Sequence, residues 1–238
     1  MPKELDRTWQ LLEDFAEAAR LLHNYADDPD VADTVCELAL KVVGGDHASI
    51  TSVRSGSFTT VAATSDLPER ADKLQYKAGS GPCLDAARES ATIRVDDLAT
   101  DPRWPTFGSA ASAELGMHSM LAHVLPIDQD ALGALNVYSA RPHAFTAQHE
   151  TALAVFGTAA VTALSAARHQ EKAEQLERAL HTSRRIGVAL GIVMATRRVD
   201  LDGAWALLSK ASQDSNTKVS QLADDVINTG SLEVRWED

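Results

Sequence analysis

The segment from Thr182 to Gly230 constrains the fold of this chain most, because its apolar residues recur at helical spacing in three successive runs. Asp200 or Asp202 can cap the second run, and Gly230 can end the third. Asn216 or Thr217 can cap the third run at its start. The pattern therefore predicts three short helices over residues 182–230.

The first of these helices has two different faces. Its apolar face carries Ile186, Ala189, Leu190 and Val193. Its roughly opposite face carries Arg184, Gly187, Gly191, Ala195 and Arg198. Each glycine inside a helix costs about 1 kcal/mol relative to alanine. This cost is tolerable where another backbone approaches closely, so either a partner helix or a nucleic acid held by the arginines is expected there.

The second helix carries a polar stripe beside its core face. The stripe consists of Trp205, Ser209, Ser212 and Asn216. An aromatic ring next to hydrogen-bonding groups suits unstacked RNA bases. The alternative is that Trp205 is a partly buried core residue.

The charge of the chain is unevenly distributed. The net charge is −12, which excludes a general attraction to phosphate. Residues 168–238 hold 10 basic and 11 acidic side chains, whereas residues 182–230 hold 6 basic and 5 acidic ones. The acidic excess lies in the first two thirds, which favours two units with different roles.

The first two thirds of the chain alternate between helical and strand patterns. The expected helices are Glu4–Tyr25, Val31–Val43, Cys83–Glu89, Ser109–Leu115 and Phe145–Ala167, the last running on unbroken through Arg168–His181. The expected strands are His47–Arg54, Phe58–Ser65, Thr92–Val95, His118–Pro126 and Ala131–Ser139. This order predicts an α+β fold with one antiparallel sheet flanked by helices.

Cys36 and Cys83 are the only cysteines, and no C-x-x-C is present, so neither a structural zinc site nor a disulfide framework is expected. Cys83 lies in the first turn of a predicted helix, where the helix dipole lowers a thiol pKa. It is therefore either a redox or covalent sensor thiol or a small buried residue. His118 and His123 would point to opposite faces of one strand and cannot share a metal.

No catalytic grouping of side chains stands out, so an enzyme is not expected, and the sequence leaves any cofactor unknown. No basic n-region followed by an apolar h-region opens the sequence, so no signal peptide is expected, and no apolar run approaches the roughly 20 residues that span a bilayer. These features predict a soluble, cytoplasmic protein with no membrane partner.

The helix that joins the two units carries a heptad-like spacing. The spacing links Leu176, Leu180, Ser183, Gly187, Leu190 and Met194. It predicts a short parallel coiled coil in a homodimer. The alternative is a single solvated helix.

Three segments of the first unit resemble the GAF domain. They are G-S-G-P-C-L-D-A at 79–86, V-D-D-L-A-T-D-P-R-W at 95–104 and L-G-A-L-N-V-Y-S at 132–139. The resemblance implies a central antiparallel sheet with a small-molecule pocket on one face, and it leaves the ligand unknown.

The C-terminal segment is similar to the ANTAR domain over Arg184–Ile227. The similarity rests on R-x-I-G-x-A-x-G-I-x-M, then A-x-x-x-L, then S-x-x-S-N-x-K-V and A-x-x-V. It implies a three-helix module that binds hairpin RNA in nascent mRNA and blocks an intrinsic terminator, typically as a dimer. The order GAF then ANTAR is similar to that of one-component antiterminators in actinobacteria.

The residues expected to contact RNA are Arg184, Arg185, Gly191, Arg197, Arg198, Trp205, Lys210, Ser212, Asn216 and Lys218. Leu190 and Ser220 stand where the family usually has basic residues, which predicts weaker RNA binding.

The expected organisation has five parts. They are an N-terminal amphipathic helix at 1–30, a GAF-like sensor domain at 31–164, a linker helix at 165–181, an ANTAR RNA-binding domain at 182–230 and a tail at 231–238. Two alternatives remain for the C-terminal bundle. It is a protein-interaction module on a ligand-binding GAF dimer, or it is part of a DNA-binding helix-turn-helix regulator.

Overall fold

The computed structural model describes residues 16–22, 30–54, 56–128 and 131–232. Residues 16–22 are helical, and the rest of the predicted helix Glu4–Tyr25 lies outside the described residues. Of the predicted tail at 231–238, residues 233–238 also lie outside them. The chain divides into two compact units, residues 1–169 and 170–238.

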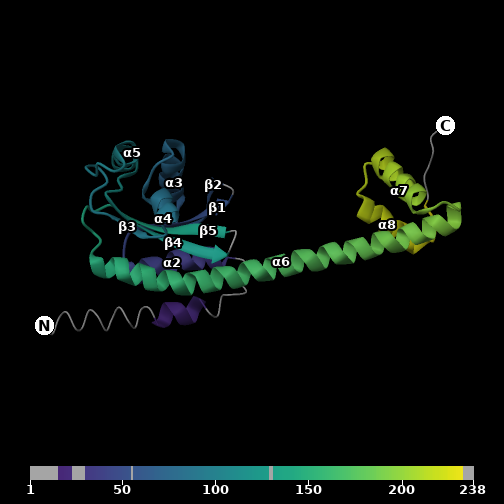
Figure 1. The fold of residues 1–238 in the computed structure, drawn as a ribbon, viewed down its shortest axis with the longest axis horizontal. Helices are drawn as coiled ribbons and strands as arrows, with labels where there is room; N and C mark the ends of the chain where they lie inside the picture. Colours follow the sequence, from purple (N-terminus) through teal and green to yellow (C-terminus); the bar gives the residue numbers. More distant parts are fainter. Residues whose placement is uncertain (1–15, 23–29, 55, 129–130, 233–238) are drawn as a thin grey trace. The chain divides into compact units, whose positions relative to one another are not determined.

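The first unit is built on a five-stranded antiparallel sheet in the order β2-β1-β5-β4-β3 (Figure 1). Its strands are β1 His47–Arg54, β2 Ser57–Ala63, β3 Thr92–Val95, β4 Ser119–Asp128 and β5 Ala131–Ser139. Its helices are α2 Val31–Val43, α3 Asp66–Ala78, α4 Pro82–Glu89, α5 Pro105–Leu115 and the first part of α6, which runs over Ala147–Arg197. This arrangement confirms the predicted α+β class.

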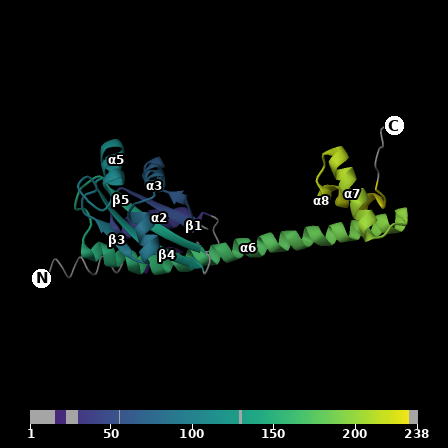
Figure 2. The same ribbon diagram turned by 45° about the horizontal axis from the view of Figure 1, so that its top comes forward.

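Helices cover both faces of the sheet, with α2 and α6 on one side and α3, α4 and α5 on the other (Figures 1 and 2). The α2/α6 face is apolar, since Ile50, Leu135 and Leu121 pack there against Val35 and Phe156. The opposite face has apolar packing around its margin, and polar side chains occupy part of its buried interior. The two faces of the sheet are therefore chemically different.

The sequence pattern predicted no helix over Asp66–Ala78, where the structure has α3. The sequence does carry a helical signal there, since Leu67, Ala71 and Leu74 recur at helical spacing before Gly79, and these residues pack in the core. The buried side of α3 also includes the polar residues Asp72 and Gln75. The expected helices and strands from Val31 onward are present, and the observed ends of several of them differ by a few residues.

The second unit consists of the remainder of α6, α7 Leu201–Ser215 and α8 Val219–Thr229. The expected apolar face of the first helix is confirmed, because Ala189, Leu190 and Val193 are buried with Ala204 and Leu208 of α7. The three-helix arrangement therefore has its own small core.

Helix ends in this unit are fixed by local chemistry. The Gly203 N–H donates to Asp200 Oδ1 at 2.8 Å, so Asp200 caps α7 as predicted. The prediction that Asn216 or Thr217 caps α8 is wrong: Lys218 holds that position, and no side chain caps the helix. Asn216 instead ends α7 in the left-handed conformation, with φ 50°.

By length and composition alone, α6 contains one stretch apolar enough to cross a membrane. The sequence analysis predicted no such stretch. Within the first unit, Leu153, Phe156 and Ala160 of this helix are buried in the core shared with the sheet and α2. This packing is that of a core helix in a soluble domain.

Candidate ligand site and nucleic-acid interface

A group of fully buried polar side chains lies between the sheet and helices α3 and α4. We call this group the polar cluster; its members are Ser49, Thr51, Asp72, Gln75, Cys83, Asn136 and Tyr138, each 0% exposed. The β1–β5 pairing sets Ser49 directly opposite Asn136. A polar cluster of this size is unusual in a domain core, where buried side chains are mostly apolar.

Asp72 lies at the centre of the hydrogen bonds in the polar cluster. The Tyr138 hydroxyl donates to Asp72 Oδ1 at 2.6 Å, and the Thr60 hydroxyl donates to Asp72 Oδ2 at 3.0 Å. Gln75 Nε2 donates to the Tyr138 hydroxyl at 3.1 Å, and Gln75 Oε1 accepts from the Cys83 N–H at 2.9 Å. These bonds connect α3 to both the sheet and the start of α4.

Asn136 has more acceptors around its amide nitrogen than it has hydrogens. The nitrogen lies 3.2 Å from Asp72 Oδ1 and 3.2 Å from Thr51 Oγ1, with Ser49 Oγ and Cys83 Sγ at 3.3 and 3.4 Å. A primary amide carries two N–H hydrogens, so these four acceptors cannot all be satisfied by it. Asn136 Oδ1 is buried without any hydrogen-bond partner.

Burial dominates the electrostatics of the polar cluster. Desolvation raises the pKa of Asp72 to about 6, although hydrogen bonds from Tyr138, Ser49, Thr60 and Asn136 oppose the rise. Desolvation, reinforced by the negative charge of Asp72, raises the pKa of the Cys83 thiol to about 12. The expected lowering of this pKa by the helix dipole is therefore wrong. Cys83 is a buried, protonated thiol that donates to Thr51 Oγ1 at 3.2 Å.

The polar cluster was missed in the sequence, apart from Cys83. A signal for it does exist in β5, where Asn136 and Tyr138 alternate with apolar residues in the segment L-N-V-Y-S. A strand whose one face is polar, in a sheet covered on both faces by helices, indicates a polar core.

A separate surface groove of about 540 Å³ borders the edge strand β3. Both of its arginines are paired: Arg94 with Asp96 and Glu150, and Arg103 with Asp101. Among the described residues, no group of three or more potential ligands could hold a metal ion. His123 accordingly has a local role, with Nδ1 2.7 Å from the Thr92 hydroxyl, and burial lowers its pKa.

The C-terminal unit exposes the arginine and glycine face of α6. Arg184, Gly187, Gly191 and Arg198 are all exposed. A Cβ atom built on Gly187 or on Gly191 would meet nothing within 4 Å. No described residue of this unit therefore requires glycine at these positions, and the helix backbone there is open to close approach.

Two of the expected RNA-binding arginines are engaged inside the unit. Arg185 pairs with Asp224 of α8, and Arg197 donates to the Leu232 carbonyl oxygen at 2.8 Å. Arg184, Arg198 and Lys218 are exposed, and none of them makes an ion pair with a described residue. Lys210 is exposed on α7. The cations presented to solvent are therefore fewer than the sequence suggested.

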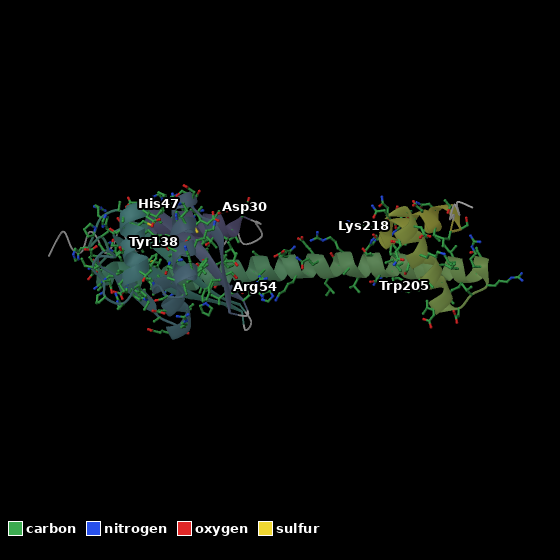
Figure 3. All side chains as sticks on the ribbon, turned by 90° about the horizontal axis from the view of Figure 1, so that it is seen from above. Asp30, His47, Arg54, Tyr138, Trp205 and Lys218 are labelled. Atoms are coloured by element: carbon green, nitrogen blue, oxygen red, sulfur yellow. The ribbon has the colours of Figure 1, made fainter. Side chains whose placement is uncertain are left out.

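The polar stripe of α7 is partly at the surface. Trp205 is 48% exposed, one turn after the exposed Leu201, so it is not a core residue. Figure 3 shows Trp205 and Lys218 in this unit, and Tyr138 in the sheet unit. Ser212 donates to the Thr217 carbonyl oxygen at 2.6 Å, which fixes the turn that follows α7. Asn216 is exposed at that turn.

The heptad-like spacing of α6 is exposed over only part of its predicted length. Leu176 and Leu180 are 62% and 49% exposed, and Ser183 and Gly187 are exposed beside them. Leu190 is instead buried in the core of the C-terminal unit, with Met194 packed against that core. The exposed seam therefore ends at Gly187. The burial of Leu190 also explains an apolar residue at one of the two positions where a basic one was expected.

Two family models match the chain. The model of the GAF domain matches residues 26–165, and the model of the ANTAR domain matches residues 174–227. No curated protein matches the chain.

Solved structures with a similar fold include three bacterial proteins. A free methionine-R-sulfoxide reductase from Neisseria meningitidis is 15% identical, with a TM-score of 0.53 over 67% of this chain and 90% of that one. An N-acylhomoserine lactone dependent LuxR family transcription factor from Burkholderia cenocepacia is 15% identical, with a TM-score of 0.53 over 66% and 98%. The GAF domain of an Acinetobacter phosphoenolpyruvate-protein phosphotransferase is 13% identical, with a TM-score of 0.51 over 66% and 94%. At these identities the likeness concerns the fold of the first unit alone.

Proposed function

The chain belongs to the GAF domain family and carries an ANTAR domain at its C-terminal end, and on this premise we propose that it is a transcription antiterminator. Its ANTAR domain binds hairpin RNA in nascent mRNA, and its GAF domain senses a small molecule. Both domains are regulatory rather than catalytic, so the proposal assigns no reaction to the chain.

The observation that carries this proposal is the exposed face of α6 in the C-terminal unit. It presents Arg184 and Arg198 together with Gly191, on a chain whose net charge is −12. Arginine side chains bind phosphate oxygens, and exposed glycines allow a sugar-phosphate backbone to approach the helix closely. A local cationic face on an acidic protein favours a specific site over general attraction to nucleic acid.

One continuous helix contributes to both units. The α6 residues Leu153 and Phe156 are buried in the sheet unit, and Ala189 and Val193 are buried in the C-terminal unit. A ligand can shift such a system only if it binds two of its states with different affinity. We therefore propose that the signal acts through α6.

The proposed function is tested by binding and transcription together. In filter binding, the full chain should prefer an RNA with two adjacent hairpins over an unstructured RNA of equal length and composition. In transcription reactions with purified polymerase, it should increase read-through of a terminator that overlaps those hairpins. Equal binding to both RNAs, with no change in read-through, would contradict the proposal.

We further propose that the chain is a homodimer joined along α6, because Leu176 and Leu180 are exposed apolar residues one turn apart. Light scattering at micromolar concentration should give twice the 25.5 kDa chain mass. Leu176→Glu with Leu180→Glu should give the monomer mass, because like charges at a helix seam repel.

Val188→Glu is the matched control for the dimer. It places a charge at an apolar position of similar exposure on the same helix, turned by about 100° from the seam residue Gly187. The wild-type chain at monomer mass would refute the dimer, as would equal dissociation by the seam and control variants.

A second function for the C-terminal unit is favoured by one observation. Leu201 and Trp205 are neighbouring apolar side chains, both exposed on α7. Such a pair is typical of a protein-interaction surface. Loss of a protein partner on Trp205→Ala, with RNA binding unchanged, would support that alternative.

A further inference from the structure

The exposed spacing on α6 is longer than the pair Leu176 and Leu180. Toward the start of the helix, the same alternation of three and four residues continues into the part of α6 that packs on the sheet. We call this row of side chains the α6 seam; its members are Val155, Ala159, Thr162, Ala166, His169, Ala173, Leu176, Leu180, Ser183 and Gly187. Ala159 is half-buried, and every other member is exposed. The α6 seam is therefore an unpartnered face that runs about 50 Å along one helix.

The α6 seam differs in composition from the helix surface around it. No member is an aspartate, glutamate, lysine or arginine. The charged residues of the stretch 168–178 all lie off the seam; they are Arg168, Glu171, Lys172, Glu174, Glu177 and Arg178. A single helix in water has no reason to sort its charges in this way, because all of its faces are solvated. The sorting is typical of a face that packs on another helix.

The flanking charges favour a second copy of the chain, aligned in parallel, as the occupant of this face. With the seam residues at the a and d positions of a heptad, Lys172 takes a g position and Glu177 the following e position. In a parallel pair of helices these two positions face each other across the interface. Lys172 of one copy then lies beside Glu177 of the second copy, and the twofold symmetry repeats this attraction on the other side of the seam.

His169 is the one ionisable side chain in the α6 seam. A parallel pair of identical helices sets each seam residue level with the same residue of the second copy, so the two His169 rings would lie side by side. Ala166 and Ala173 precede and follow His169 in the seam, and their small side chains leave room for the two rings. The interface therefore has a titratable pair near its middle.

The charges near His169 come from α6 and from the end of β4. On α6, the adjacent Arg168 and Lys172, which follows one turn later, are both cations. One turn earlier, Ser165 donates to the Ile127 carbonyl oxygen, so the end of β4, which includes Asp128, lies near this part of α6. The positions of the second copy that surround His169 in a parallel pair are Ala166, His169, Gln170 and Ala173. The second copy thus places no carboxylate beside a protonated His169.

We propose that two copies of the chain pair in parallel along the whole α6 seam and that protonation of the paired His169 residues loosens this interface. Two neutral imidazole rings can pack side by side, whereas two imidazolium rings repel each other. An unperturbed histidine changes its charge near pH 6.5, so the response falls between about pH 7.5 and pH 5.5. The interface rests on the homodimer proposed above, extends it into the first unit and gives it a response to pH.

The test is the dissociation constant of the dimer, measured by sedimentation equilibrium of the full chain at pH 7.5 and pH 5.5 and constant ionic strength. The constant should rise by about tenfold or more at pH 5.5, because the separated chains bind protons that the dimer excludes. His169→Gln should remove this dependence on pH, and His169→Leu should remove it and tighten the dimer. The control His181→Gln changes an exposed histidine of the same helix outside the seam and should keep the wild-type response. A wild-type constant that does not change with pH would overturn the histidine contact, and so would an equal change in His169→Gln.

A second pair of variants tests how far the interface extends. Val155 and Val61 are valines of the first unit with 47% and 54% exposure, and only Val155 belongs to the α6 seam. Val155→Glu should weaken the dimer by about tenfold or more at pH 7.5, because it places like charges opposite each other in the seam. Val61→Glu, on β2, should leave the dissociation constant unchanged. Equal effects of the two variants, or no effect of Val155→Glu, would show that the interface does not reach the first unit.

Filter binding to hairpin RNA on the same samples separates this interface from the proposed function. A pH-sensitive dimer that binds no hairpin RNA would overturn the antiterminator role and leave the interface standing. A dimer that binds RNA but does not respond to pH would overturn only the histidine contact. A wild-type chain that is monomeric at pH 7.5 would refute both the homodimer and the α6 seam as its interface.

Discussion

Replacing Arg184, Arg198 and Lys218 together by alanine should weaken binding to hairpin RNA by about 100-fold at fixed salt, if each cation makes one phosphate contact of roughly 1 kcal/mol. Each of these three side chains is exposed in the C-terminal unit and makes no ion pair with a described residue. With each phosphate contact that is lost, fewer counterions are released from the RNA on binding. The slope of log affinity against log salt should therefore become shallower by about 2 to 3. Filter binding over a series of salt concentrations measures both quantities.

The matched control removes the same charge from the sheet unit. Lys41, Arg70 and Lys77 are exposed there, and their replacement by alanine lowers the net charge equally. This control should leave both the affinity and the salt slope within about twofold, because screening by salt weakens charges that do not touch the RNA. Equal losses from the two triple variants would mean that total charge, rather than the α6 face, governs binding.

Arg185 differs from these surface cations in its surroundings. Its guanidinium pairs with Asp224, 39 residues further along the chain, and that contact connects α6 to α8. The residue pattern along one helix cannot show a partner on another helix. The prediction from the sequence therefore included Arg185 and Arg197 among the cations available to bind RNA. Distinguishing bound from available arginines required the folded unit.

Much of the fold could be predicted because punctuating residues mark its elements. Helix Val31–Val43 ends at Gly44, and strands His47–Arg54 and Thr92–Val95 have the ends that their alternation predicted. The α6 helix was expected to be continuous because its apolar spacing passes without a break from one unit to the next. Helices and strands that carry an apolar face are the ones that periodicity finds.

The candidate ligand site was largely hidden for the same physical reason. Helix α3 turns Asp72 and Gln75 inward beside its apolar residues, and an apolar spacing does not show which polar side chains are buried. Cys83 was singled out, but the sign of its pKa shift depended on burial and on Asp72, neither of which could be read along the chain. Hydrophobic patterns do not predict which polar side chains are buried for function. The residues that the sequence analysis missed are accordingly those of the polar cluster.

Replacing Asp72 by asparagine should stabilise the unliganded chain at neutral pH, by an amount that depends strongly on pH. Folding raises the pKa of Asp72 from 3.8 to about 6, so between these values the folded state holds a proton that the unfolded state has lost. Stability contributed by Asp72 is therefore complete below about pH 4 and declines as the pH rises through about 6. Over this window the loss amounts to about 3 kcal/mol, because each unit of pKa corresponds to about 1.4 kcal/mol.

The measurement is chemical unfolding of wild type and Asp72→Asn at several values between pH 4 and pH 8. The free energy of unfolding of the variant relative to wild type should rise by about 3 kcal/mol across that range and level off above about pH 7. Asp66→Asn should show no comparable rise, because its carboxyl is exposed at the start of α3. A constant difference between wild type and Asp72→Asn at every pH would mean that Asp72 is not a buried acid with a raised pKa.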